Sequence, residues 1–140
     1  MIRNVTPVDA QALIEKEGYR YVDVRTEEEF EAGHPAGAVN IPVLIAGIGP
    51  NPDFVPVVSA VFEPDTPLVL GCGSGGRSMR AAEILSRAGF TSVVNMDGGF
   101  NGRFSPMGGL LQAGWAQEGL PVSHELTDET SYASLRSKRA

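Results

Sequence analysis

The residues best suited to chemistry lie in one short segment, Cys72-Gly73-Ser74-Gly75-Gly76-Arg77-Ser78, which holds the only cysteine of the sequence. Glycines allow backbone conformations that other residues avoid, so successive N–H groups of such a loop can point inward as an anion-binding nest. A thiol that faces several N–H donors ionises more easily than a free cysteine, and the thiolate is the nucleophile. The segment therefore predicts a reactive thiolate at Cys72, held at the mouth of a ring of inward-pointing amides.

The residues after the cysteine are expected to hold the substrate. Gly73, Ser74, Gly75 and Gly76 supply backbone N–H groups, and Arg77 supplies a permanent positive charge. Ser78 is expected to cap the following helix, whose N-terminus adds the positive end of its dipole. Such a cradle binds an anion and stabilises charge that moves during group transfer. A lone cysteine is usually a small buried apolar residue, but this combination favours a nucleophile.

The elements around this segment alternate between strand and helix. Residues 67–71 form an uninterrupted apolar run, typical of a strand that is covered on both faces, and Ser78–Ala88 has helical composition. Strands are also expected over residues 19–24, 38–41 and 91–96, and helices near residues 7–16, 26–32 and 54–62. This order predicts a single-domain, three-layer α/β/α fold with a mainly parallel sheet, whose ligands bind at the carboxyl ends of the strands.

Composition excludes several classes of function. The 140 residues are 42% hydrophobic and 20% charged, with a net charge of −6. This negative balance disfavours nucleic-acid or anionic-membrane binding, and no apolar run approaches the ~20 residues that span a bilayer. One cysteine with His34 and His124 makes a zinc site improbable, so neither a metal nor another cofactor is expected. The N-terminal residues do not resemble a signal peptide, and a soluble cytoplasmic protein is expected.

The segment CGSGGRS at Cys72–Ser78 resembles the active-site loop of the rhodanese family of sulfurtransferases. Three further stretches resemble that family's other signatures, in the same order: Tyr21–Arg25 with Glu28, Glu29 and Phe30; Gly33–Pro42; and Gly98-Gly99 with Trp115–Val122. The likeness covers about residues 4–122 and is closest to small single-domain members, including plant senescence-associated ones. It implies a rhodanese-like domain over residues 1–122. Residues 123–140 are polar, lack an apolar face and end in basic residues, so they are interpreted as a tail, with helix over part of it at most, that lies outside the core.

The resemblance implies a thiosulfate sulfurtransferase. In that family the cysteine takes a sulfane sulfur from a donor such as thiosulfate and becomes a persulfide. It then passes the sulfur to a thiophilic acceptor, which can be cyanide or a thiol. The sequence has no second cysteine to resolve a Cys72 persulfide, so the acceptor is a separate small molecule or a protein.

Two alternatives stand beside sulfur transfer. The first is a cysteine-dependent phosphatase or arsenate reductase. Four residues separate Cys72 from Arg77, whereas cysteine phosphatases place five there, and the shorter loop favours a terminal sulfur over a tetrahedral oxyanion. The second is a non-catalytic binding module that shares the fold.

The sequence departs from the family pattern between Phe100 and Trp115, where fourteen residues replace the usual few. Residues Leu110-Leu111 are expected to begin a helix in this insertion. The insertion is predicted to serve either as a lid or docking surface beside Cys72 or as a packed surface excursion.

Three polar or aromatic positions outside the loop are interpreted as structural. Asp23 and Arg25 are expected to form an ion pair, with Glu28 or Glu29 nearby. His34 is interpreted as a hydrogen-bonding residue of a loop, and Trp115 as a core aromatic whose N–H has a partner.

Overall fold

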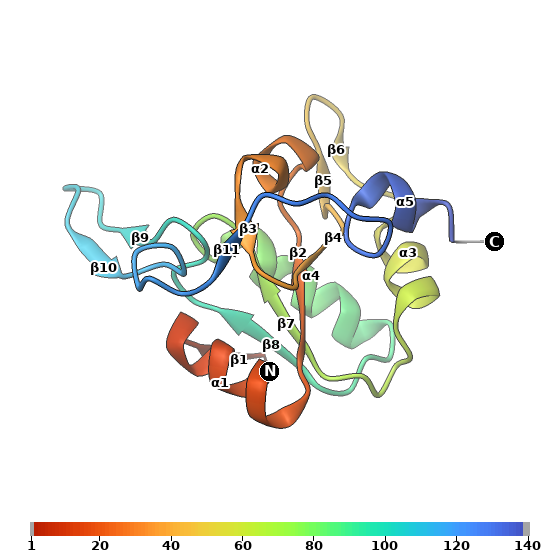
Figure 1. The fold of residues 1–140 in the computed structure, drawn as a ribbon, viewed down its shortest axis with the longest axis horizontal. Coiled ribbons are helices and arrows are strands. Elements are labelled where there is room, and N and C mark those ends of the chain that lie inside the picture. The colour runs from red at the N-terminus through yellow and green to blue at the C-terminus, as the bar shows by residue number, and fades with distance from the viewer. Residues whose placement is uncertain (1, 139–140) are drawn as a thin grey trace.

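Five parallel strands form the central sheet in the order β1-β8-β7-β2-β4 in the computed structural model, which describes residues 2–138 (Figure 1). These strands are β1 (Arg3–Val5), β2 (Arg20–Asp23), β4 (Val39–Asn40), β7 (Leu68–Gly71) and β8 (Val93–Met96). The helices are α1 (Pro7–Glu17), α2 (Glu27–Ala32), α3 (Phe54–Val61), α4 (Gly76–Arg87) and α5 (Tyr132–Arg136). The predicted single-domain α/β fold with a parallel sheet is confirmed.

Local sequence signals explain where the first two helices begin. The Thr6 hydroxyl accepts a hydrogen bond from the Asp9 amide, so Thr6 is the N-cap of α1. Thr26 and Glu29 form a capping box at the start of α2, in which each side chain accepts from the other's backbone N–H. No helix within residues 2–138 is long and apolar enough to cross a membrane.

The sheet separates two apolar clusters, because successive side chains of a strand point to opposite faces. On β7, Leu68 and Leu70 face one cluster and Val69 faces the other. The first cluster is covered by side chains of α3, α4 and α5, and the second by α1, Phe30 of α2 and Trp115. All four residues of β7 are buried, as predicted from its apolar run, and the strand leads directly into Cys72.

Several short pairings were not expected from the sequence. β1 pairs with β8 along the sheet edge, and β5 (Leu44–Ile45) pairs with β6 (Gly49–Pro50). A third pairing joins β3 (His34–Pro35) to β11 (Val122–Ser123). Two- and three-residue strands carry too little pattern to be recognised by periodicity.

The expectation of a helix at Leu110-Leu111 is wrong. Residues 103–112 form a hairpin in which β9 (Arg103–Phe104) pairs antiparallel with β10 (Leu110–Gln112). The turn is closed by hydrogen bonds between Ser105 and Gly109, and Gly108 takes a φ of 90°. Pro106, Gly108 and Gly109 between the paired segments are typical turn residues, and here they outweigh the helical propensity of leucine.

The expectation that residues 123–140 lie wholly outside the core is also wrong. Tyr132 and Leu135 of α5 are 3% and 1% exposed and belong to the first apolar cluster. The Tyr132 hydroxyl accepts a hydrogen bond from the Asn51 side chain at 2.9 Å. Two apolar residues three positions apart are enough to seat one helical turn, although the segment is polar on average. The domain boundary at residue 122 stays a prediction.

Candidate active site

The residues predicted to form the site lie together at the carboxyl end of β7. Strand β7 ends at Gly71 and α4 begins at Gly76, so Cys72 starts the turn between them. The Gly75 N–H donates to the Cys72 Sγ at 3.1 Å, and the Ser78 Oγ lies 3.4 Å from the same sulfur. We call residues 72–78 the active loop. Its backbone wraps the sulfur in the way expected of an anion nest.

A second segment, residues 98–101, holds the active loop in this orientation, and we call it the bracing segment. Its amides donate to the carbonyls of the loop: Phe100 to Cys72 at 2.7 Å, Asn101 to Gly73 at 2.9 Å, and Gly98 to Ser74 at 3.1 Å. The C=O and N–H of a trans peptide point in opposite directions. Because three successive carbonyls are held outward, the amides of the next residues are left on the inner side, where the sulfur lies.

Gly99 makes this close approach possible. Its φ is +57°, and a Cβ added to it would lie 2.5 Å from the Cys72 carbonyl oxygen and 2.5 Å from the Gly73 carbonyl carbon. No side chain fits between the two backbones at that distance. The sequence marked Gly98-Gly99 only through the family resemblance, because the pairing of two loops leaves no periodic pattern.

The surroundings of Cys72 favour its thiolate. Burial alone would raise the pKa of the thiol, but hydrogen bonds from the Ser78 hydroxyl and from the amides of Ser78, Gly75 and Ser74 lower it below its ordinary value. Cys72 is only 1% exposed. The sulfur therefore lies at the base of the loop, and the expectation of a thiol at an open mouth is wrong in this respect.

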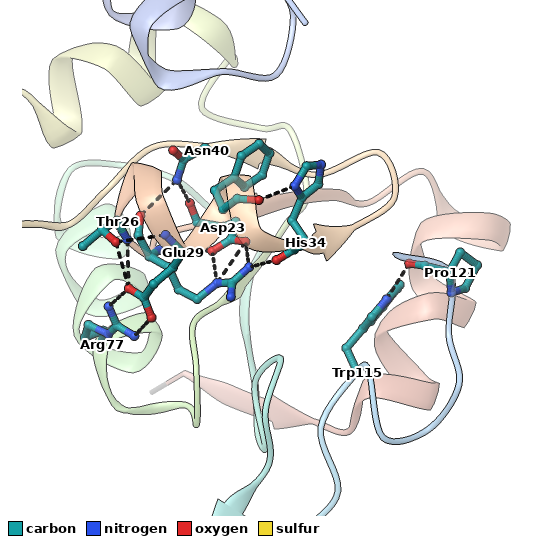
Figure 2. A network of polar contacts seen from close by, with 11 residues as sticks. Asp23, Thr26, Glu29, His34, Asn40, Arg77, Trp115 and Pro121 are labelled. Atoms are coloured by element: carbon teal, nitrogen blue, oxygen red, sulfur yellow. Dashed lines mark hydrogen bonds and ion pairs between the residues drawn. The ribbon is translucent and has the colours of Figure 1, made fainter. Parts of the chain in front are cut away.

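Arg77 is positioned beside the loop, but its charge is already balanced. Its guanidinium donates to both carboxylate oxygens of Glu29, at 2.7 and 3.0 Å, as Figure 2 shows. The hydrogen bond from Arg77 lowers the pKa of Glu29 to about 2, so the carboxylate is ionised at neutral pH. Because Glu29 also caps α2, it joins the starts of α2 and α4. The site offers an ion pair at this point and not the free cation that the sequence suggested.

Ser78 does not cap α4 as expected. The N-cap of α4 is Gly75, which has no side chain to offer, and Ser78 is a buried residue in the first turn. Its Oγ lies 2.5 Å from the Oδ1 of Asn95 on β8. Asn95 is 2% exposed and was missed by the sequence analysis. Its signal was present as a polar residue within the otherwise apolar run Val93–Met96.

The residues interpreted as structural have the expected contacts (Figure 2). Arg25 donates to both carboxylate oxygens of Asp23, and one nitrogen also donates to the Gly33 carbonyl at 2.7 Å. The His34 Nδ1 donates to the Phe30 carbonyl at 2.7 Å. Trp115 is 1% exposed, and its Nε1 donates to the Pro121 carbonyl at 2.7 Å. Each group is used within the fold.

The hairpin projects from the body of the molecule next to the bracing segment (Figure 1). Arg103 at its base forms an ion pair with Asp97 at 2.7 Å. Its apolar residues are exposed, and they are Phe104, Met107, Leu110 and Leu111. The insertion is therefore not the packed surface excursion that was one of its two expected forms.

Comparison with known proteins places this geometry in a family. A model of the family described as "Rhodanese-like domain" matches residues 6–103. The chain belongs to this family, which confirms the resemblance seen in the sequence.

Individual relatives agree with this assignment. The chain is 42% identical over 108 residues to "Thiosulfate sulfurtransferase 16, chloroplastic" of Arabidopsis thaliana, which covers 75% of this chain and 80% of the relative. It is 39% identical over 97 residues to "Senescence-associated protein DIN1" of Raphanus sativus, covering 67% of this chain and 53% of the relative. The crystal structure of Rv0390 from M. tuberculosis has a TM-score of 0.72 at 28% identity, covering 87% of this chain and 97% of that one. The cytoplasmic location of this chain stays a prediction.

Proposed function

We propose that this protein is a sulfurtransferase in which Cys72 carries a sulfane sulfur from a donor such as thiosulfate to a thiophilic acceptor. The observation that carries the proposal is the orientation of the active loop. Its amides face the Cys72 sulfur because its carbonyls are bound by residues 98–101. An anion at the sulfur position, or on a sulfur bonded to it, is stabilised there. The similarity to relatives named as thiosulfate sulfurtransferases supports the same activity.

The reaction needs two displacements at sulfur. The Cys72 thiolate attacks the outer sulfur of thiosulfate, a new S–S bond forms, and sulfite leaves with the electron pair of the old bond. The acceptor, cyanide or a thiolate, then attacks the outer sulfur of the persulfide, and the Cys72 thiolate leaves with the electron pair of that bond. The sequence has one cysteine, so the acceptor comes from another molecule, which can be a protein.

The Arg77–Glu29 ion pair bears on the choice of donor. Thiosulfate is a dianion, and the Arg77 guanidinium beside the loop already binds a carboxylate. The Arg77 Nη2 lies 3.3 Å from the position of a Cβ on Gly73, so this side chain lies against the active loop. Since Cys72 is 1% exposed, a donor reaches the sulfur when side chains around the loop move. We propose that an anionic donor competes with Glu29 for Arg77 as it enters.

The decisive experiment is to incubate the protein with thiosulfate and to weigh it intact. We expect the gain of one sulfur atom, its loss on adding cyanide with release of thiocyanate, and no gain in the Cys72→Ala variant. The sequence has a single cysteine, so a sulfur atom that the wild type gains and the C72A variant does not gain is bonded to Cys72.

Two other outcomes would overturn the proposal. Hydrolysis of an aryl phosphate or reduction of arsenate, without sulfur gain, would identify a phosphatase or an arsenate reductase. If the protein neither gains sulfur nor acts on aryl phosphate or arsenate, and if Cys72 resists alkylation in the folded protein, the protein is a binding module.

A further inference from the structure

Behind the Cys72 sulfur, Ser78 begins a chain of polar side chains whose further members the proposed reaction does not use. It runs from Ser78 on α4 to Asn95 on β8 and ends at Asn4 on β1. Ser78 and Asn95 are 0% and 2% exposed, whereas Asn4 is exposed. A buried polar network of this kind fixes hydrogen positions, because every donor must find an acceptor.

The Asn95 amide can be oriented in only one way. Its Nδ2 lies 3.3 Å from the Gly75 carbonyl oxygen and 2.9 Å from the Asn4 Oδ1. A backbone carbonyl can only accept, so the amino group of Asn95 must face Gly75. The Asn95 Oδ1 therefore faces Ser78.

Ser78 has one hydroxyl proton and three acceptors around it. Its Oγ lies 2.5 Å from the Asn95 Oδ1, 3.2 Å from the Gly75 carbonyl oxygen and 3.4 Å from the Cys72 Sγ. An amide oxygen carries no proton, so the shortest of these contacts requires the Ser78 proton to lie between the two oxygens. In this position the hydroxyl presents a lone pair to the sulfur, which suits a protonated thiol. The hydrogen bond by which Ser78 lowers the thiol pKa forms only when the same proton turns from Asn95 to the sulfur.

We propose that Asn95 is a positioning residue that competes with Cys72 for the single hydroxyl proton of Ser78. Asn95 thereby opposes ionisation of the thiol, while the loop amides favour it. The hydroxyl turns to the sulfur when Cys72 carries negative charge and returns to Asn95 when the charge moves to the outer sulfur of the persulfide. The role of Asn95 in sulfur transfer rests on the function proposed above. The thiol pKa, however, can be measured without any sulfur donor.

Three other titratable groups near the site leave this competition unchanged, because each is neutral or already paired. Tyr21 on β2 has its pKa raised by burial, so its phenol is neutral at the pH values of interest. Arg77 on α4 is paired with Glu29 on α2. On the side of β8, Asp97 is paired with Arg103.

The test replaces Asn95 and measures the pKa of Cys72 from the ultraviolet absorbance of the thiolate, with the C72A protein as the blank. In Asn95→Leu the competing acceptor is gone, and we expect the thiol pKa to fall by about half a unit or more. The N95L variant leaves no former partner of the Asn95 amino group buried without a hydrogen bond. The Gly75 carbonyl still accepts from the Met79 amide at 3.2 Å, and Asn4 is exposed to water. In Asn95→Asp the acceptor is stronger and charged, and we expect the pKa to rise.

Two controls separate positioning from a general loosening of the site. In a Ser78→Ala background, Asn95→Leu should no longer move the thiol pKa, because Asn95 acts through Ser78. Asn51→Leu removes another buried amide, which bonds Pro42 and Tyr132 and no residue of the active loop, and should also leave the thiol pKa unchanged. The pH profile of sulfur loading should shift in the same direction as the thiol pKa in each variant.

Three results would overturn the inference: an unchanged or raised pKa in N95L, equal shifts of N95L with and without Ser78, or shifts of N95L and N95D in the same direction. Failure of the wild-type protein to take up sulfur, with these pKa shifts intact, would instead refute the sulfur-transfer proposal alone.

Discussion

The active loop precedes the bracing segment in the chain and the hairpin follows it, and the fold constrains the two in different ways. Both are rich in glycine. Three successive carbonyls of the active loop are bound by residues 98–101, and its cysteine is 1% exposed. The hairpin is joined to the body by the partly exposed Arg103–Asp97 pair, and its Met107 is 95% exposed.

This difference shows that glycine serves two purposes in the same chain. At Gly99 the missing side chain lets two backbones meet, which orients the amides that face the sulfur. At Gly108 the glycine only allows a turn, since a Cβ there would meet nothing within 4 Å. The chemistry of the site therefore depends on backbone contacts between loops, whereas the hairpin is free to vary its side chains.

The comparison is tested most strongly by substituting alanine at these two glycines. In Gly99→Ala the new Cβ would overlap the carbonyl groups of Cys72 and Gly73, so the loop must move. We expect the rate of sulfur loading from thiosulfate to fall about 100-fold, because the reacting group is misplaced. We also expect the free energy of unfolding to fall by about 3 kcal/mol. Intact mass against time and denaturant unfolding measure the two effects.

The matched variant is Gly108→Ala. Both glycines have positive φ, +57° and +90°, so both substitutions strain the backbone by roughly 1–2 kcal/mol. Only the first adds a clash with the active loop. Loading by G108A should equal that of the wild type, and equal loading by G99A would refute the role assigned to the bracing segment.

The sequence was sufficient for the parts of the molecule that are locally coded. The short helix α2, the apolar strand β7 and the loop that follows it are all predicted at their observed places. These features depend on residues within one or two turns of each other, so their pattern is visible in the chain.

The parts that were missed depend on contacts between distant segments. Asn95 meets Ser78 across seventeen positions, and Glu29 meets Arg77 across forty-eight. A free arginine and a capping serine were the natural interpretation of the loop taken alone. The burial of Tyr132 and Leu135 was missed for the same reason, since α5 packs on α3 and Tyr132 bonds Asn51, both far from the tail in sequence.

A smaller effect is expected from Glu29→Gln, which releases Arg77 beside the active loop. We expect the KM for thiosulfate to fall roughly three-fold, since the guanidinium no longer binds a full negative charge. Glu28→Gln is the control, because it removes the same charge from the same turn of α2 without touching Arg77. An equal fall of KM in both variants would mean that the net charge, and not Arg77, governs donor binding.

The same ion pair has a predictable pH dependence. The pKa of Glu29 is lowered from 4.5 to about 2, so the folded state favours the ionised carboxylate. Its contribution to stability is present above pH 4.5 and is lost as the pH falls towards 2. Both side chains are about one-third exposed, so screening by solvent limits the contribution of the ion pair to the free energy of unfolding to at most ~1 kcal/mol. The difference in unfolding free energy between wild type and E29Q should shrink over that range.

The smallest effect on stability and on sulfur loading is expected at the hairpin. It is measured by replacing a leucine of the hairpin with alanine and comparing the result with the same replacement at a buried leucine. Leu111 on β10 is 56% exposed, and Leu135 on α5 is 1% exposed. Leu111→Ala should change the unfolding free energy by less than about 0.5 kcal/mol and leave sulfur loading unchanged, whereas Leu135→Ala should cost about 2–4 kcal/mol. If L111A destabilised the protein as much as L135A, the hairpin would have to pack on the body in solution. The contrast between a braced active loop and a free hairpin would then be wrong, because both would owe their positions to burial.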